Sequence, residues 1–217
     1  MRKSGCFLLL NLTNLQNSHA RWHGSIVLPV LFLLLAPATH SQSSASVAQA
    51  NLNYLVENAQ TIVRGNVVSA VLEPHPQFGN LQTVVVTIAV AKTFKGQAAA
   101  KVTFRQYVWN VKDVAGGGGY HKSEELLLFL NPTSVYGLTS PVGMEQGHFR
   151  VLLDNQGNRH AVNGRGNVGL FTDVITKSMA RGVTFSAQAN AMLSKSGGQV
   201  SLATLEETIQ ALVAVRP

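Results

Sequence analysis

The chain has 217 residues, of which 46% are hydrophobic and 12% charged, and its formal net charge is +7. This composition excludes a disordered chain and supplies enough Val, Leu and Ile for a buried core. The basic residues mostly stand singly in the sequence, so the positive charge does not predict nucleic-acid binding.

An apolar segment near the N-terminus predicts export. Residues 26–36 form a run of signal-peptide length, far short of the roughly 20 residues that a membrane-spanning helix needs. Ala36 and Ala38 put small residues at the two positions that signal peptidase inspects. We therefore expect a signal peptide over residues 1–38 and a secreted or periplasmic protein. A cut after Ala45 and an uncleaved anchor are the alternatives.

Cysteine usage excludes several chemistries. Cys6 is the only cysteine of the chain, and it would be removed with the signal peptide. The mature chain would then have no disulfide, no thiol nucleophile and no cysteine metal ligand. Because Cys6 precedes the apolar run rather than following it, attachment of a lipid is not expected.

The first part of the mature chain predicts a helix followed by a strand. Residues 39–50 are polar and rich in Ser, Ala and Gln, which indicates a flexible lead-in. Apolar residues recur at helical spacing from Leu52 to Ala59, which predicts a short amphipathic helix. The β-branched stretch 61–71 predicts a strand, and Gly65 inside it predicts a bulge or a sharp bend.

The middle of the chain predicts further strands. Alternating apolar residues predict strands over 83–94 and 101–108, which are separated by a turn at Lys95-Gly96. The solid apolar run 125–130 predicts a strand that is covered on both faces. Residues 148–153 and 158–162 predict a hairpin around a turn at 154–157.

After Phe171 the pattern weakens until Ser201, which can cap a helix whose apolar stripe runs to Val213. We therefore assign residues 51–171 to the main domain and residues 172–217 to a linker and a C-terminal helix. No strand–helix alternation is present, which argues against a parallel doubly wound sheet. The predicted fold class is mainly β (α+β): a small OB-like antiparallel β-barrel of five or six strands with a flanking helix at each end.

Several known motifs are matched only in part. Residues 164–169 fit G-x-G-x-x-G, but no strand–helix unit and no suitably spaced acidic residue accompany them. Residues 119–123 lack the glycine that a phosphate loop needs before Lys-Ser. Glu124 and Glu125 are adjacent, so on a strand they point to opposite faces and cannot flank one glycosidic bond. We expect no cofactor and no catalytic constellation, although a triad from distant residues stays open.

The histidines do not have the spacing of a zinc site. With a four-residue turn, Leu153 pairs with Asn158 and His160 with Val151, which puts His148 and His160 on opposite faces of the hairpin. A turn that is one residue longer or shorter puts both on one face, but about two residue pairs apart, too far for one metal ion. We therefore expect no metal site.

Aromatic residues beside glycine-rich loops are candidates for contacts with a partner. One such loop surrounds residues 116–119, and a second covers residues 136–147. The candidate partner-binding residues are Tyr107, Trp109, Tyr120, His121, Tyr136 and Met144. The alternative is that Tyr107 and Trp109 end a strand against the core.

Four segments resemble a widespread kind of uncharacterised bacterial secreted protein: Ile62–Val67, Phe94–Gly96, Ser123–Leu130 and Gln146–Val151. The resemblance covers about residues 52–171. Its layout is similar to the OB-type barrel of netrin modules and tissue inhibitors of metalloproteinases. The resemblance implies the fold rather than an activity. Ser123 stands where the turn glycine is usual, and the zinc-binding N-terminal cysteine of the inhibitors has no counterpart here.

These observations predict an exported non-catalytic binding module, and its sharpest version is a protease inhibitor. The expected partner is an extracellular or envelope protein or polymer, not a nucleic acid, and no stable membrane span is expected after signal cleavage. The alternatives are a hydrolase acting on an envelope polymer and a structural envelope component that self-associates through exposed strand edges.

Overall fold

The structure is a computed structural model that describes residues 48–108 and 117–215. The expected signal peptide, Cys6, most of the lead-in and Trp109 lie outside the described residues.

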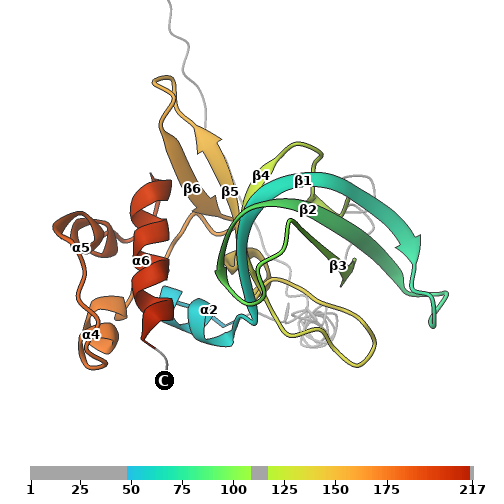
Figure 1. Ribbon diagram of the computed structural model, residues 1–217, viewed down its shortest axis with the longest axis horizontal. Coiled ribbons are helices and arrows are strands. Elements are labelled where there is room, and N and C mark those ends of the chain that lie inside the picture. The colour runs from blue at the N-terminus through green and yellow to red at the C-terminus, as the bar shows by residue number, and fades with distance from the viewer. Residues whose placement is uncertain (1–47, 109–116, 216–217) are drawn as a thin grey trace, which may run out of the picture. The chain divides into compact units, whose positions relative to one another are not determined.

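The described residues form one antiparallel sheet of seven strands flanked by four helices (Figure 1). The strand order is β3-β2-β1-β4-β5-β6-β7. The strands are β1 (Thr61–Pro74), β2 (Gln82–Lys95), β3 (Lys101–Tyr107), β4 (Glu125–Leu130), β5 (His148–Leu153), β6 (Arg159–Asn163) and β7 (Val200–Ser201). The helices are α2 (Leu52–Asn58), α4 (Val174–Met179), α5 (Ala187–Leu193) and α6 (Leu202–Ala214).

The mainly β class is confirmed, but the sheet is not closed into a barrel and has seven strands instead of five or six. The two edge strands, β3 and β7, do not pair with each other, and another segment lies along the outer edge of β3. Arg105 on β3 pairs instead with Leu138 of the loop after β4, and its carbonyl accepts a hydrogen bond from the Thr139 amide (2.7 Å). The short β7 leads directly into α6, so the chain leaves the sheet after two residues.

The two longest strands, β1 and β2, are bent along their shared length. Their pairing shifts register at three places, one of them between Arg64 and Gly65. A Cβ atom at Gly65 would lie 2.1 Å from the carbonyl oxygen of Ala89, a distance that no side chain tolerates. The bulge predicted at Gly65 is therefore confirmed, and the close approach of β2 explains why the position needs glycine.

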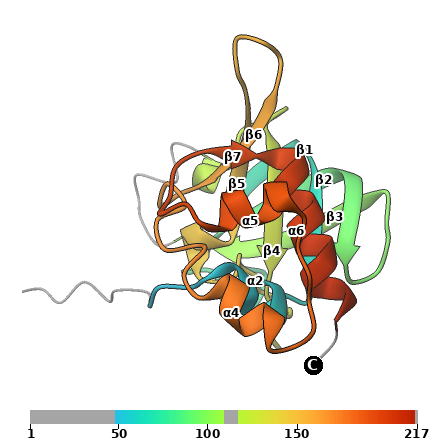
Figure 2. The same cartoon turned by 90° about the vertical axis from the view of Figure 1, so that its left-hand side faces the viewer.

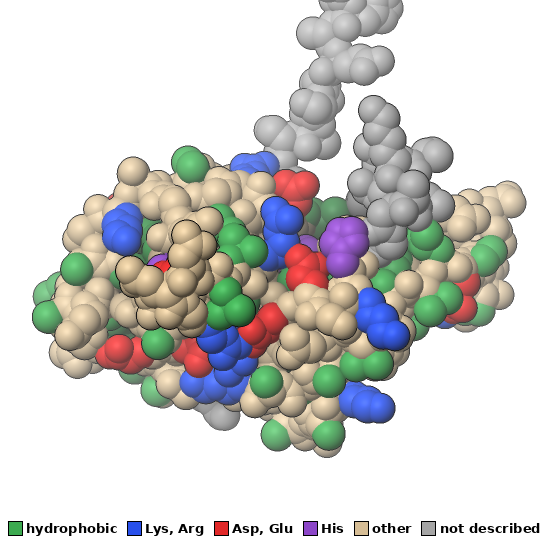
Figure 3. Space-filling model, turned by 90° about the horizontal axis from the view of Figure 1, so that it is seen from above, with side chains coloured by type: hydrophobic (Ala, Val, Ile, Leu, Met, Phe, Trp, Pro, Cys, Tyr) green, Lys and Arg blue, Asp and Glu red, His purple; other side chains and the backbone are tan. Residues whose placement is uncertain are grey.

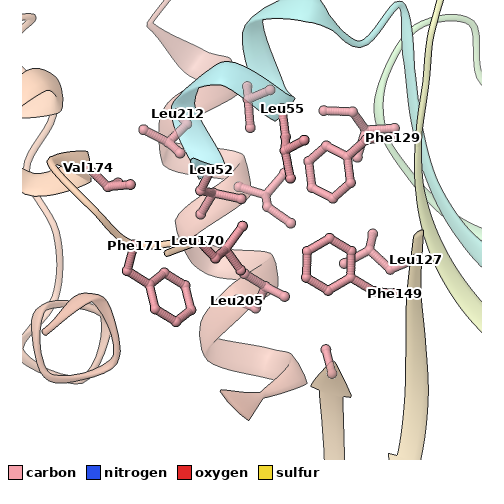
Figure 4. Packing of buried hydrophobic residues seen from close by; sticks show 14 of the residues in the cluster. Leu52, Leu55, Leu127, Phe129, Phe149, Leu170, Phe171, Val174, Leu205 and Leu212 are labelled. Atoms are coloured by element: carbon pink, nitrogen blue, oxygen red, sulfur yellow. The ribbon is translucent and has the colours of Figure 1, made fainter. Parts of the chain in front are cut away.

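Strand β4 is covered on both faces, as its unbroken apolar run predicts. Leu127 and Phe129 belong to a core between the sheet and the helices, which lie in front of β4 and β5 in Figure 2. Figure 4 shows Phe129 and Phe149 facing the leucines of α2 and α6 in this core. Leu126 and Leu128 belong to a second core on the other face, where the bent β1 and β2 and the ring of Tyr120 enclose them.

The helices at both ends follow the predicted pattern. Ser201 caps α6 as expected, and Asn51, which was not predicted as a cap, caps α2. The apolar stripe of α6 is buried; its members are Leu202, Leu205, Ile209 and Leu212. In the described part of the chain, no helix has both the length and the apolar character to cross a membrane.

Residues 172–200, expected as a linker, contain the short helices α4 and α5. Val174 of α4 and Met192 and Leu193 of α5 are buried in the core that α2 and α6 share. Each helix has only six or seven residues, which is too short for a repeating apolar pattern to stand out. The Ser186 side chain, which accepts a hydrogen bond from the Ala189 amide, is the local signal for α5.

A cluster of ion pairs joins α6 to the sheet. Arg64 on β1 donates from Nε to Glu206 Oε1 (2.5 Å) and from Nη1 to Glu125 Oε1 (2.6 Å). Lys92 on β2 donates to Glu206 Oε2 (2.8 Å), and Arg159 on β6 also pairs with Glu125. Since the Arg64 and Glu206 side chains are only 14% and 12% exposed, loss of one partner would leave a buried charge without compensation.

We therefore expect Glu206→Gln to lower the free energy of unfolding by roughly 2–3 kcal/mol, because the amide cannot neutralise Arg64 and Lys92. The neighbouring Glu207 is exposed, so Glu207→Gln removes the same charge without touching the cluster. Urea unfolding of the purified protein compares the two variants. Equal stability of both variants would contradict the role given to the cluster.

Candidate functional site

A pocket of about 570 Å³ lies between the two glycine-containing loops. Its walls come from the end of β3, the residues after the Gly-rich 3₁₀ turn (Gly117–Gly119), the second 3₁₀ turn (Met144–Gln146) and the start of β5. These segments are far apart in the sequence and are brought together by the pairing of β4 with both β1 and β5. On the face that Figure 3 shows, side chains of both charges and a histidine lie next to one another.

Four of the six predicted partner-binding residues line this pocket: Tyr107, Tyr120, His121 and Met144. His121 is exposed, whereas Tyr120 is only 3% exposed, so its ring belongs to the pocket wall and to the second core together. Trp109 lies outside the described residues.

Tyr136 lies away from the pocket. It belongs to the loop after β4 and packs against the turn between β1 and β2. Its carbonyl oxygen accepts a hydrogen bond from His75 Nε2 (2.8 Å), while His75 Nδ1 accepts one from the Gln77 amide (3.1 Å). The Tyr136 ring meets Phe78 edge to face at 5.5 Å. Both rings are exposed, and this aromatic contact is separate from the pocket.

Tyr120 is held in place by three contacts. Its hydroxyl donates to Gln106 Oε1 (2.7 Å), its ring stacks on His148 with 4.9 Å between centroids, and it meets Phe104 edge to face. Burial, and to a smaller extent Glu124, raises the pKa of the phenol. Tyr120 is therefore a neutral donor that fixes one wall of the pocket.

His148, the first residue of β5, is the most unusual group in the pocket. Its Nε2 atom is buried and has no hydrogen-bond partner among the described residues. Burial, reinforced by the nearby Arg150, lowers the pKa of the imidazole to about 4. The ring is therefore neutral near pH 7.

Charged groups of both signs stand around His148. Glu124 Oε2 accepts a hydrogen bond from the His121 amide (3.3 Å). Glu145 and Arg150 are exposed, and within residues 48–108 and 117–215 the side chain of neither forms an ion pair or a hydrogen bond. A carboxylate and a guanidinium, neither paired with a described residue, therefore border the same pocket.

The adjacent Glu124 and Glu125 point to opposite faces, as predicted. Glu124 lines the pocket, whereas Glu125 belongs to the ion-pair cluster on the helix side of the sheet.

The turn that carries Met144 and Glu145 is fixed by Gln146. The Gln146 side chain donates to the Ala48 carbonyl (2.9 Å) and accepts from the Ala50 amide (2.7 Å). Its own carbonyl accepts a hydrogen bond from Asn163 Nδ2 (3.0 Å). The pocket wall is thereby attached to the first described residues and to β6.

The G-x-G-x-x-G segment forms packed turns after β6. Asn167, in the left-handed region at φ 59°, exchanges hydrogen bonds with Asn163 and donates to the carbonyls of Ala161 (3.1 Å) and Gly198 (2.8 Å). The strand–helix context of a dinucleotide site is not formed by this segment, because further turns connect it to α4.

The turn of the β5–β6 hairpin is one residue longer than a four-residue turn. Leu153 pairs with Arg159 and Leu152 with His160, so the four-residue pairing is wrong and the longer alternative is confirmed. His148 and His160 therefore share a face but stay apart, and His160 contacts Asp154 (3.0 Å) instead. In the part of the chain that the structure describes, no three His, Asp or Glu side chains are grouped as metal ligands.

Comparisons of the chain with protein-family models, with curated proteins and with solved structures found no match. The role of the pocket is therefore inferred from its geometry alone. The pocket is lined by residues 106–108, 118–121 and 143–145, by His148 and by Arg150.

Sequence reasoning missed Gln106, Glu145, His148 and Arg150 as pocket residues. The one available signal was the strand alternation of β5, which puts His148 and Arg150 on the same face. It could not show what that face meets, because the facing loops are distant in sequence.

We predict that stability falls as the pH is lowered from 7 to 4. The pKa of His148 is about 4 in the fold against 6.5 for an ordinary imidazole, so the unfolded chain binds the proton more tightly. The contribution of His148 to the free energy of unfolding is therefore full above pH 6.5. It falls by about 3 kcal/mol as the pH is lowered to 4. Urea unfolding at several pH values measures this slope.

In His148→Phe this part of the slope should disappear, since the ring no longer titrates. His121→Gln, at an exposed position in the same pocket, should keep it. A His148→Phe protein with an unchanged pH slope would show that another group carries the acid sensitivity.

Proposed function

We propose that this chain is an exported, non-catalytic binding protein that receives a segment of its partner in the pocket between residues 118–121 and 143–145. The observation that carries the proposal is that two exposed side chains of opposite charge, Glu145 and Arg150, line this pocket and have no ion-pair or hydrogen-bond partner among the described residues.

The unpaired groups favour binding over a purely structural role. Glu145 and Arg150 are solvated in the free protein and can be paired by a ligand without breaking an existing ion pair. The two groups therefore offer a ligand contacts that the described residues do not use.

The pocket also has a suitable size and stiffness. Its volume of about 570 Å³ lies within the usual range of ligand pockets. Its wall is held by the Tyr120–Gln106 hydrogen bond and by the contacts of Gln146, so little ordering remains to be done on binding.

The support for export is the apolar run 26–36 with Ala36 and Ala38 behind it. The support for an OB-like relationship is the resemblance of the four strand motifs, together with the bending of β1 and β2 around the second core. Protease inhibition is the most specific form of this proposal, and it rests on the same resemblance. Incubation with secreted metallo- and serine proteases tests that version, and unchanged protease activity would remove it.

The binding proposal is tested by affinity capture from the extracellular and envelope proteins of the source organism. We expect a stoichiometric partner that the Glu145→Gln, Arg150→Gln double variant no longer captures. Lys177→Gln, an exposed charge on α4, serves as the control and should capture it normally. Equal capture by the double variant would show that the partner binds outside the pocket.

A second candidate, a hydrolase acting on an envelope polymer, is supported by one observation. Glu124 and Glu145 come from different loops and both line the pocket, so two carboxylates could act on one bond. Release of soluble fragments from a dye-labelled cell-wall preparation would reveal such an activity, and Glu124→Gln should abolish it. No release by the unaltered protein would exclude the candidate.

A further inference from the structure

We propose that the pocket binds a peptide through a carboxylate group, which Arg150 contacts beside His148, while Glu145 pairs with a positively charged or N–H group of the same peptide. This inference rests on the proposed binding function and names the chemistry of its ligand. The pairing of β4 with β5 sets the starting geometry, because His148 lies opposite Leu128 and Arg150 opposite Leu126.

Arg150 is placed to recognise a carboxylate. Alternate residues of a strand share a face and stand roughly 7 Å apart, so the guanidinium and the imidazole lie side by side along the pocket wall. A guanidinium presents paired N–H donors that match the two oxygens of a carboxylate. In the described residues Arg150 has no anionic partner, so the position opposite its donors is available to a ligand.

The charges around Arg150 favour a peptide over an acidic polysaccharide. Glu124 and Glu145 line the same pocket, and two carboxylates would repel a chain that carries a negative charge on every sugar. A peptide offers backbone N–H groups, and in many sequences a Lys or Arg, within a few ångströms of any carboxyl group. It can therefore satisfy Arg150 and Glu145 at the same time.

His148 supplies an internal reporter of the bound carboxylate. The titratable and charged groups around it are Arg150, Tyr107, Tyr120, His121, Glu124, Glu145 and Arg165. The positive charge of Arg150 contributes to the low pKa of the imidazole. A carboxylate held by Arg150 offsets that charge, so the pKa of His148 should rise when a carboxylate ligand binds and stay unchanged with its amide analogue.

The experiment uses the purified full chain and pools of N-acetylated, C-amidated hexapeptides, randomised except for a central Glu, Gln or Lys. We expect the Glu pool to bind at least about tenfold more tightly than the Gln pool, as loss of a charge-assisted hydrogen bond implies. Arg150→Gln should remove this preference, and Lys177→Gln should retain it. Equal binding of the Glu and Gln pools, or an unchanged preference in Arg150→Gln, would overturn the proposal.

A second readout separates a local contact from a change in overall folding. In an NMR titration with N-acetylglutamate amide, the pKa of His148 should rise from about 4, whereas the N-acetylglutamine amide control should leave it in place. Arg150→Gln alone should raise it in the free protein. An identical His148 titration with both probes at saturation would count against the carboxylate contact.

The outcomes also distinguish this inference from the binding proposal. Capture of a partner that depends on the pocket, without any preference for the Glu pool, would leave the binding function standing and reject the carboxylate. Tighter binding of polygalacturonate than of any peptide pool would reject the peptide. Absence of both partner capture and peptide binding would reject both proposals.

Discussion

The structure depends on the burial of β4 on both of its faces. A strand with five consecutive apolar residues presents apolar side chains on both faces, so both faces must be buried by other elements. The helices and β5–β6 supply the first cover, around Leu127 and Phe129. The bent β1–β2 pair and Tyr120 supply the second, around Leu126 and Leu128.

The same strand separates the two charged regions of the molecule. Glu125 points to the helix side, where Arg64 and Glu206 tie α6 to the sheet, and Glu124 points to the pocket. The first region is paired and contributes to stability, whereas Glu145 and Arg150 in the second are unpaired among the described residues. This division explains why neighbouring carboxylates have different tasks: strand alternation sends one to each side of β4.

Much of the fold is predictable because its elements have strong local patterns. The strands from β1 to β6, the bulge at Gly65 and the capped helices α2 and α6 follow from alternation, glycine position and capping residues. The open sheet was not predictable, because alternation identifies strands but not their partners, and the pairing of Arg105 at the edge of β3 with Leu138 has no sequence signature. The pocket was predictable in part: both loops were identified, but His148 became a pocket residue only through its stacking on Tyr120.

Gln146 connects the pocket wall to the segment that precedes α2. Its side chain bonds to Ala48 and Ala50, and the adjacent residues Met144 and Glu145 form one wall of the pocket. Between the two alanines, the Gln49 side chain donates to the Val168 carbonyl (2.5 Å), so the same short segment also contacts the turns after β6. The segment before α2 thus holds the pocket wall from outside the sheet, and a protein shortened to begin at Leu52 would lose both of these Gln146 hydrogen bonds and with them part of the support of the Met144–Glu145 turn.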